Sequence, residues 1–191
     1  MIHVPTEEEI AAACSRTADV ARVLELHPSV RARCVEHMDE ARAAHVPFII
    51  VCGYRSPAEQ RMEYAKGRRI IGSDPRAWPL LSPDGRGVVT HALPWQSWHQ
   101  YRLAYDIALL KPDGKTVHWN EVADLDEDGV ADWLEVVKIA ESLDLVAGYR
   151  WASRKHDGAH FEFHPALELN EAWGMCLTGK AIPDDHFERV A

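Results

Sequence analysis

Hydrophobic and polar positions in the first third of the chain predict helices around one buried strand. Apolar residues recur at helical spacing over 29–44, and the apolar, β-branched run over 46–52 predicts a buried strand. Thr6, with Glu9 at the capping-box position, predicts the start of an N-terminal helix. Proline in the first turn and glycine after the end predict a further helix over 57–66.

The second half of the chain mixes the same two periodicities. The run His160–Phe163 alternates polar and aromatic residues, which predicts a half-buried strand with His160 and Glu162 on one face. Residues 71–87 are rich in Gly, Pro and Asp and predict a loop insertion, whereas the tail from Pro165 predicts a short helix and an irregular end. Apolar residues also recur at helical spacing after residue 131, at Trp133, Val136, Val137, Ala140 and Leu143 to Leu145.

These elements predict one α+β domain over residues 1–191, with a small, mostly antiparallel sheet and helices packed around it. The length suffices for an adequate core, and no repeat, low-complexity linker or appended binding module is visible. The net charge of −9 argues against nucleic acid as a partner, because phosphate binding calls for clustered Lys and Arg. No run approaches the ~20 apolar residues of a membrane span, so we expect no membrane insertion. We also expect the protein to be a monomer.

Two segments, 97–106 and 157–161, contain the components of a hydrolytic zinc site. Two histidines and one carboxylate are a common ligand set for zinc that keeps a fourth position for water. A second carboxylate is then needed beside the water to take its proton and hand it to the leaving amine. Asp157, three residues before His160, is the natural candidate for that carboxylate.

Geometry sets conditions on this assignment. Residues three apart in a plain strand point to opposite faces, so Asp157 and His160 converge only if the backbone bends, which Gly158 permits. The spacing of His99 and Asp106 suits ligands near the adjoining ends of two strands that are joined at 100–103. The chain holds 11 histidines, and a lone histidine near an acid is usually structural, so neither segment suffices alone.

Together the segments resemble a family of zinc peptidases that cut bacterial cell-wall peptides. This family includes D-Ala-D-Ala carboxypeptidases and the L-alanyl-D-glutamate endopeptidases of phage endolysins. The likeness runs from about residue 28 to residue 165. Three motifs carry it: Ser97-x-His99-x-x-x-x-Ala104-x-Asp106, Asp157-x-x-His160-Phe161, and Gly53-Tyr54-Arg55-Ser56 with Gln60.

The resemblance implies a LAS/hedgehog-like peptidase architecture and a role for each motif residue. Zinc would be bound by His99, Asp106 and His160, with Asp157 as the catalytic acid and base. Arg55 would face the substrate carbonyl, where a guanidinium at a strand end could stabilise an oxyanion, a contribution of roughly 3 to 4 kcal/mol in other hydrolases. A surface salt bridge is the alternative for Arg55.

One residue departs from the family pattern. The glycine that the pattern places three residues after the first histidine is Arg102 here. Arg102 must either adopt an ordinary backbone conformation or bear strain. The departure puts the local turn in doubt and leaves the ligands unaffected.

A second constellation, at residues 124–135, matches the EF-hand calcium loop. Oxygen donors fall at loop positions 1, 3, 5, 9 and 12, with glycine at position 6 and a backbone carbonyl at position 7. A turn at 111–114 leaves little room for an incoming helix, so we expect a single loop followed by the predicted helix. A solvated acidic loop that caps this helix is the alternative. The predicted calcium ligands are Asp124, Asp126, Asp128, Val130, Asp132 and Glu135.

Cysteine usage and the N-terminus predict a cytoplasmic product. The four cysteines, Cys14, Cys34, Cys52 and Cys176, lack metal-type spacing and are expected to be reduced thiols, with disulfides as the alternative. The first nine residues lack the basic and apolar regions of a signal peptide. By family resemblance, the enzyme would reach the cell wall after release, with the help of a holin.

Several tryptophans and histidines lie close to the motifs in sequence. Trp98 is expected to pack in the core, and Trp95 and Trp151 could flank a cleft. His156 and His164 adjoin the second zinc motif and could be mistaken for ligands.

The predicted function is hydrolysis of peptidoglycan stem peptides, at the bond from L-Ala to D-Glu, with zinc as the catalytic metal and calcium as a stabilising or regulatory one. A D,D- or L,D-carboxypeptidase is the alternative enzyme. A cell-wall-binding module that is stabilised by metals and cuts nothing is the alternative outside enzymes.

Overall fold

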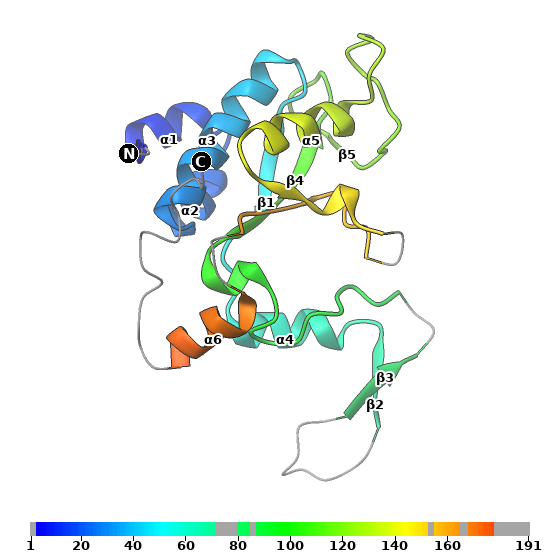
Figure 1. Ribbon diagram of the computed structural model, residues 1–191. Helices are drawn as coiled ribbons and strands as arrows, with labels where there is room; N and C mark the ends of the chain where they lie inside the picture. The colour runs from blue at the N-terminus through cyan, green and yellow to red at the C-terminus, as the bar shows by residue number, and fades with distance from the viewer. Residues whose placement is uncertain (1–2, 72–79, 85–86, 153–154, 165–167, 178–191) are drawn as a thin grey trace.

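The computed structural model describes residues 3–71, 80–84, 87–152, 155–164 and 168–177 (Figure 1). Its elements in chain order are α1 (Glu7–Ala13), α2 (Thr17–Glu25), α3 (Pro28–Ala43), β1 (Phe48–Cys52), α4 (Pro57–Ala65), β2 (Arg68–Ile71), β3 (Leu80–Pro83), the 3-10 helix η1 (Trp98–Tyr101), β4 (Ala104–Leu110), β5 (Val117–His118), α5 (Asp132–Ser142), β6 (Val146–Ala147), the 3-10 helix η2 (Gly148–Arg150), β7 (His160–Glu162) and α6 (Leu169–Leu177).

The main sheet is antiparallel throughout its described pairs, in the order β1-β4-β7-β6, with β5 paired to β4. In Figure 1, α1, α2, α3 and α5 gather around this sheet in one half of the molecule, whereas α4, α6 and the β2–β3 hairpin lie in the other half. The mixture of helices and an antiparallel sheet confirms the predicted α+β class.

Local signals in the sequence account for the starts of α1 and α4 and for the end of α4. Thr6 and Glu9 form the predicted capping box of α1, and Ser56 and Glu59 form a second one at α4. Gly67 has φ +69° and follows the end of α4, where a Cβ atom would strike the Gly87 carbonyl. These caps satisfy backbone N–H groups that the first helical turn leaves without partners.

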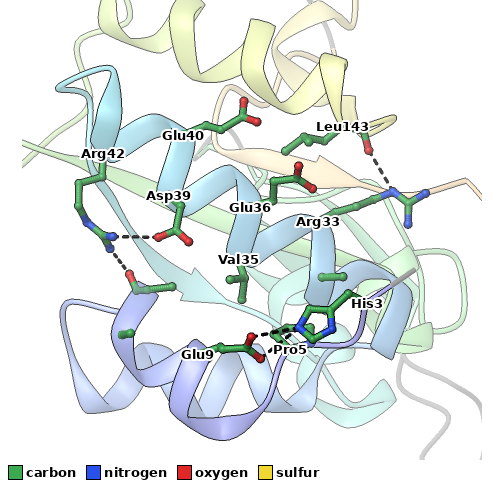
Figure 2. A pocket seen from close by; sticks show the side chains of 13 residues that line it. His3, Pro5, Glu9, Arg33, Val35, Glu36, Asp39, Glu40, Arg42 and Leu143 are labelled. Carbon is green, nitrogen blue, oxygen red and sulfur yellow. Dashed lines mark hydrogen bonds and ion pairs between the residues drawn. The ribbon is translucent and has the colours of Figure 1, made fainter. Parts of the chain in front are cut away.

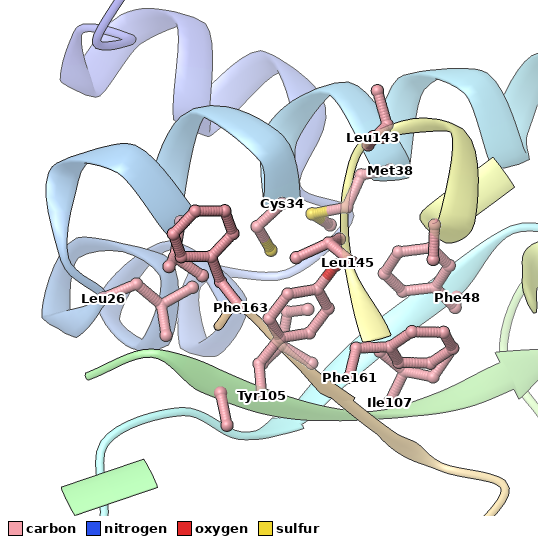
Figure 3. Close-up of a cluster of buried hydrophobic side chains, with 14 of the residues drawn as sticks. Leu26, Cys34, Met38, Phe48, Tyr105, Ile107, Leu143, Leu145, Phe161 and Phe163 are labelled. Atoms are coloured by element: carbon pink, nitrogen blue, oxygen red, sulfur yellow. The ribbon is translucent and has the colours of Figure 1, made fainter. Parts of the chain in front are cut away.

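The core lies between the sheet and the helices that cover one of its faces (Figure 3). Phe48, Tyr105 and Phe161 project from three neighbouring strands toward α3. Burying each such side chain contributes roughly 1.5–3 kcal/mol. The apolar residues predicted on the inner face of α5 are buried there: Trp133, Val136, Val137 and Ala140, with Leu143 and Leu145 just beyond the helix.

Strand β4 separates this core from the opposite face of the sheet. Tyr105 and Ile107 point into the core, and alternation along the strand therefore turns Asp106 toward the other face. That second face holds only a small apolar cluster, formed by Ile49, Ala108 and Leu110. A carboxylate can therefore stand in the middle of the sheet without entering the core.

Two sequence-based predictions about local structure were wrong. The segment 71–87 was expected to be a loop, but Ile71 and Leu80–Pro83 belong to the β2–β3 hairpin, and residues 72–79 and 85–86 lie outside the described part. His99 was expected near the end of a strand, but it lies in η1, and the strand begins only at Ala104. The first error arises because Gly, Pro and polar residues lower strand propensity while tertiary pairing overrides it. The second arises because the spacing of His99 and Asp106 does not by itself distinguish a strand from a short 3-10 helix.

The structure also bears on the predictions about a membrane span, the cysteines and Trp98. Among the described residues, no helix has the length and apolar character needed to cross a membrane. Cys14, Cys34 and Cys52 are free thiols, as expected, and the Cys176 side chain lies outside the described part. Trp98 is buried in the core, as predicted, although it lies in a 3-10 helix instead of a strand.

Candidate active site and metal centre

The register of the sheet assembles the candidate metal centre. Asp106 lies in β4, directly opposite His160 of β7 and opposite Cys52 at the end of β1. The β1 register shifts between Ile50 and Cys52, which marks an irregularity next to the site. Two strands far apart in sequence thus bring the predicted ligands Asp106 and His160 together, and η1 adds His99.

Three side-chain atoms form a nearly equilateral triangle. The His99 Nε2 atom lies 3.1 Å from Asp106 Oδ1 and 3.2 Å from His160 Nδ1, and the last two atoms are 3.0 Å apart. One proton per nitrogen cannot satisfy all three contacts at once, whereas one cation held by all three atoms could. His99 and His160 are 2% and 6% exposed, so solvent does not supply the missing partners.

The atoms of the three ligand side chains that point away from the triangle are also held in place. His99 Nδ1 donates to the Gly53 carbonyl at 2.7 Å, and His160 Nε2 lies 2.8 Å from Glu162 Oε2. Arg55 donates from Nη2 to Asp106 Oδ2 at 3.2 Å. Each predicted ligand is therefore oriented by a neighbour on its far side, as is usual for metal ligands in proteins.

Charges within the triangle are strongly coupled. Burial alone would raise the pKa of Asp106, but the adjacent His99 and His160 hold that pKa far below its ordinary value. Burial would lower the pKa of His99, yet the Asp106 carboxylate raises it to about 10. A cation that binds here must displace these protons, so its binding releases protons to solvent.

Asp157 approaches the triangle through the predicted bend. The His160 amide donates to the Asp157 carbonyl at 3.2 Å, closing a turn over Gly158 and Ala159. Burial raises the pKa of the Asp157 carboxyl, and the nearby Asp106 carboxylate adds to the shift. A carboxyl with a raised pKa next to a metal centre suits proton transfer.

Gly148 is a site residue that sequence reasoning missed. A Cβ atom on Gly148 would lie 2.5 Å from the Asp157 carbonyl oxygen and 3.2 Å from His160 Cβ. The Asp157 amide also donates to the Gly148 carbonyl at 3.2 Å. No periodicity or motif marks this glycine, because its role depends on a turn nine residues away in sequence.

The sequence left open whether Arg102 has an ordinary backbone conformation or a strained one, and the structure shows the strained one. Its φ is 65° and its ψ is 23°, the left-handed conformation that the family glycine would take freely. The Arg102 carbonyl accepts from the His27 amide at 2.9 Å, and Arg102 Nη1 donates to the Glu25 carbonyl at 3.3 Å. The turn between His99 and Asp106 therefore keeps its shape without glycine.

An open cleft of about 1230 Å³ gives access to the triangle. His99, Asp106, Asp157 and His160 line it, and so does Arg55. The Arg55 guanidinium is braced by Gln60, whose Oε1 accepts from Nη1 at 3.1 Å and whose Nε2 donates to the Ala92 carbonyl at 2.8 Å. Arg55 thus borders the cleft while it contacts a ligand, Asp106, directly.

The two histidines that adjoin the second zinc motif, His156 and His164, are not part of the triangle. His156 pairs with Glu121 at 2.8 Å, and His164 pairs with Glu162 Oε1 at 2.6 Å. Trp151 lines the cleft as predicted, whereas Trp95 packs against the core and Tyr101. Cys52 was not predicted here. Its Sγ atom lies 4.0 Å from His99 Nδ1, and ligand atoms of Cys52, His99 and Asp106 lie within 4.8 Å of one another.

The acidic loop gathers its predicted ligands into two overlapping groups. Carboxylate oxygens of Asp124, Asp126 and Asp132 lie within 4.8 Å of one another, and so do those of Asp126, Asp128 and Glu135. Gly129 at loop position 6 has φ +94°. Residues 119–131 contain no helix, which agrees with the expectation of a loop without an incoming helix.

Two oxygens of this loop lack partners. Asp126 Oδ1 and Glu135 Oε2 are buried and accept no hydrogen bond from the described residues. Burial, together with the four neighbouring aspartates, raises the pKa of Glu135 to about 7. The arrangement concentrates carboxylate oxygens, two of them buried without a hydrogen bond from the described residues, which favours a hard metal ion.

A second hollow, of about 750 Å³, lies between α1 and α3 (Figure 2). His3 contacts Glu9, Arg42 contacts Asp39 and the Ala13 carbonyl, and Arg33 donates to the Leu143 carbonyl at 3.0 Å. These contacts engage five of the charged or titratable side chains of its wall: His3, Glu9, Asp39, Arg42 and Arg33. No group of metal-binding side chains is found among the described residues there.

Known proteins resemble this chain in sequence and in structure. It is 33% identical over 145 residues to the peptidoglycan L-alanyl-D-glutamate endopeptidase CwlK of Bacillus subtilis (strain 168), covering 76% of this chain and 74% of that protein. A family described as D-alanyl-D-alanine carboxypeptidase matches residues 90–163. The chain belongs to the M15 peptidase family. The matched span of this M15 peptidase contains His99, Asp106, Asp157 and His160, and Arg55 lies before it.

Three solved structures are also similar to the M15 peptidase described here. The L-Ala D-Glu endopeptidase ChiX of Serratia marcescens has a TM-score of 0.47 and 21% identity, with coverage of 82% of this chain and 90% of that one. VanYB in complex with D-alanine-D-alanine has a TM-score of 0.44 and 16% identity, covering 82% and 79%. The LD-carboxypeptidase LdcB has a TM-score of 0.46 and 18% identity, covering 87% and 70%.

Proposed function

We propose that this M15 peptidase is a zinc enzyme that hydrolyses peptidoglycan stem peptides between L-alanine and D-glutamate. The observation that carries the proposal is the triangle of His99, Asp106 and His160 donors, 3.0–3.2 Å apart, at an open cleft that Asp157 also lines. The likeness to CwlK supports the choice of bond.

The donor set fits zinc in chemistry and in size. Zinc binds imidazole nitrogens and carboxylate oxygens at about 2.0–2.2 Å, so ligand atoms in a tetrahedral site lie roughly 3.3 Å apart. The three observed separations, 3.0–3.2 Å, are close to that edge length. When bound, zinc supplies a Lewis acid that polarises the substrate carbonyl and acidifies a neighbouring water molecule.

Asp157 moves the proton in the proposed reaction. Its carboxylate accepts a proton from water as the water oxygen bonds to the carbonyl carbon, and returns that proton to the amine nitrogen as the C–N bond breaks. The raised pKa of Asp157 supports this role, because the protonated form must persist long enough to donate.

Arg55 has a proposed role at the substrate carbonyl. Its guanidinium donates to Asp106 Oδ2 and borders the cleft, which leaves further N–H groups on a rigidly held cation. Such a cation can stabilise negative charge that develops on the carbonyl oxygen. The same contact with Asp106 also keeps the ligand carboxylate oriented.

Digestion of purified peptidoglycan, followed by mass spectrometry of the new chain ends, tests the proposal. New D-glutamate amino ends would support the endopeptidase. Released D-alanine would instead indicate a D,D- or L,D-carboxypeptidase, an alternative favoured by the description of the matched family. Binding to the wall without any product would contradict both enzymes and indicate a binding module.

We also propose that calcium binds the loop at 124–135 and organises the part of the zinc site that comes last in the chain. The orphaned oxygens of Asp126 and Glu135 support the metal, and the Val130 carbonyl would complete the ligand set. Glu121, just before the loop, contacts His156 and lies against Gly158 of the Asp157 turn. A loop that is ordered by calcium would hold Glu121, and through it this turn.

Chelation followed by selective addition of metals tests the calcium proposal. Activity should return fully only with zinc and calcium together, and a Glu135→Gln variant should lose the calcium effect alone. Equal activity with zinc alone and with both metals would contradict the proposal that calcium organises the zinc site.

The single domain over 1–191, an endolysin role and a holin-assisted route to the wall remain predictions from sequence. Co-expression with and without a membrane-permeabilising protein in a Gram-negative host tests the endolysin role and the holin-assisted route. Lysis only when both proteins are present would support them, and lysis by the peptidase alone would contradict the need for a holin.

A further inference from the structure

The two histidines of the triangle present different ring atoms to the proposed zinc. His99 points Nε2 inward and donates from Nδ1 to the Gly53 backbone carbonyl at 2.7 Å. His160 does the reverse, with Nδ1 inward and Nε2 facing the Glu162 carboxylate at 2.8 Å. The proton on each outer nitrogen decides whether the inner nitrogen is free to bind a metal.

Glu162 is placed by the strand that carries His160. Residues two apart in β7 share a face, so the side chains of His160 and Glu162 stand side by side opposite β4. Glu162 is 8% exposed, and its second oxygen, Oε1, lies 2.6 Å from His164 Nε2. Both carboxylate oxygens thus face histidine nitrogens.

The hydrogen-bond inventory then assigns the tautomer of His160. An ionised carboxylate only accepts, so each histidine nitrogen that faces Glu162 must carry its proton. With the proton on Nε2, the Nδ1 atom of neutral His160 presents a lone pair toward Asp106 and His99. In the described part of the chain no Lys or Arg forms an ion pair with Glu162, and the partners of its two oxygens are His160 and His164.

We propose that Glu162 is a positioning residue for the zinc site. It fixes the tautomer and ring orientation of His160 and raises the basicity of the ligand nitrogen, and His164 holds Glu162 from the rim of the cleft. This inference rests on the proposed zinc site. His99 needs no such residue, because its outer nitrogen is held by the backbone of Gly53.

Three variants test the role, each studied as the full chain. Glu162→Ala removes the acceptor, whereas Glu162→Gln keeps the volume and one acceptor oxygen but removes the charge. Glu168→Gln is the matched control, because Glu168 lines the same cleft and no contact of its side chain to a ligand is found in the described residues. Circular dichroism and thermal unfolding of the metal-free proteins establish that each variant folds.

The readouts are zinc affinity, by competition with a chromophoric chelator, and the ring nitrogen NMR signals of His160. Glu162→Ala should bind zinc about 10–100-fold more weakly. In the metal-free protein, at a pH where the imidazole is neutral, its His160 ring should also lose the single Nε2–H tautomer. Glu162→Gln should lose less affinity and keep the tautomer, since the amide oxygen still accepts from Nε2. Glu168→Gln should match the wild type in both measurements.

Wild-type zinc affinity in a folded Glu162→Ala variant, with an unchanged His160 tautomer, would overturn the inference. If that variant does not fold, Glu162→Gln decides: an affinity equal to the wild type would likewise overturn it. A wild-type protein that binds no zinc would overturn the metal site of the proposed function, and this inference with it. Failure at Glu162 alone would leave the zinc site standing.

Discussion

The triangle at the cleft and the acidic loop at 124–135 both concentrate metal-binding donors, but the fold has assembled them to different degrees. In the triangle, His99, Asp106 and His160 meet within 3.2 Å, and each has a hydrogen-bond partner behind it. In the loop, carboxylate oxygens form two overlapping groups whose members lie within 4.8 Å of one another, and two buried oxygens have no partner among the described residues.

This difference follows from what supports each site. The triangle stands on paired strands, whose register is set by a buried core on their other face. The loop depends on its own turns, and like charges raise the pKa of Glu135 to about 7. A site on a sheet is therefore preorganised before metal binds, whereas a site on an acidic loop needs the cation to offset repulsion.

The largest expected effect is a loss of turnover, and it distinguishes the proposed proton carrier, Asp157, from the metal ligands. Asp157→Asn should reduce turnover by about 10²–10⁴-fold, because the amide cannot accept a proton from water. Zinc content, measured by elemental analysis, should stay at the wild-type level. His160→Ala is the paired variant and should lose the metal itself. An Asp157→Asn enzyme with wild-type turnover would contradict the assigned role.

Gly148→Ala probes preorganisation without removing a functional group. Its Cβ would lie 2.5 Å from the Asp157 carbonyl, so the turn must shift. Displacement of a catalytic group by about 1 Å can cost about 100-fold in rate, and steady-state kinetics should detect such a loss. Gly174→Ala is the control, since a Cβ there meets nothing within 4 Å. Equal rates for the two variants would show that the turn tolerates the shift.

Calcium should stabilise the protein through the loop alone. At a free concentration of about 100 times Kd, calcium should raise the free energy of unfolding by about 2.7 kcal/mol. Glu135→Gln should abolish most of that gain, as measured by thermal unfolding with calcium or chelator. Identical unfolding of the wild type under both conditions would contradict a calcium site.

The smallest effect concerns backbone strain, which both regions contain. Arg102 beside the triangle and Glu127 in the loop have φ of 65° and 61°, values that cost an ordinary residue energy. Arg102→Gly should raise the free energy of unfolding by up to about 1 kcal/mol with or without calcium. Glu127→Gly should gain less in chelator than in calcium, if the loop is ordered by the ion. A loss of stability in Arg102→Gly would mean that the Arg102 side-chain contacts outweigh the strain.

Much of the fold could be predicted because its signals are local. Capping boxes set the starts of α1 and α4, and helical periodicity identified α3 and the buried face of α5. The β2–β3 hairpin and η1 were missed, since short elements in polar segments carry weak propensity and form through tertiary contacts.

The chain by itself determined the inventory of chemistry: which residues can ligate a metal, which carboxylate can carry a proton, and where oxygen donors follow the EF-hand spacing. Only the tertiary structure decided how these groups meet. The pairing of Asp106 with His160 depends on long-range strand register. The inward atom of each histidine and the approach of Gly148 to Asp157 depend on three-dimensional contacts that no local signal marks. Register is a property of two paired strands and of the core beneath them, and no single segment encodes it.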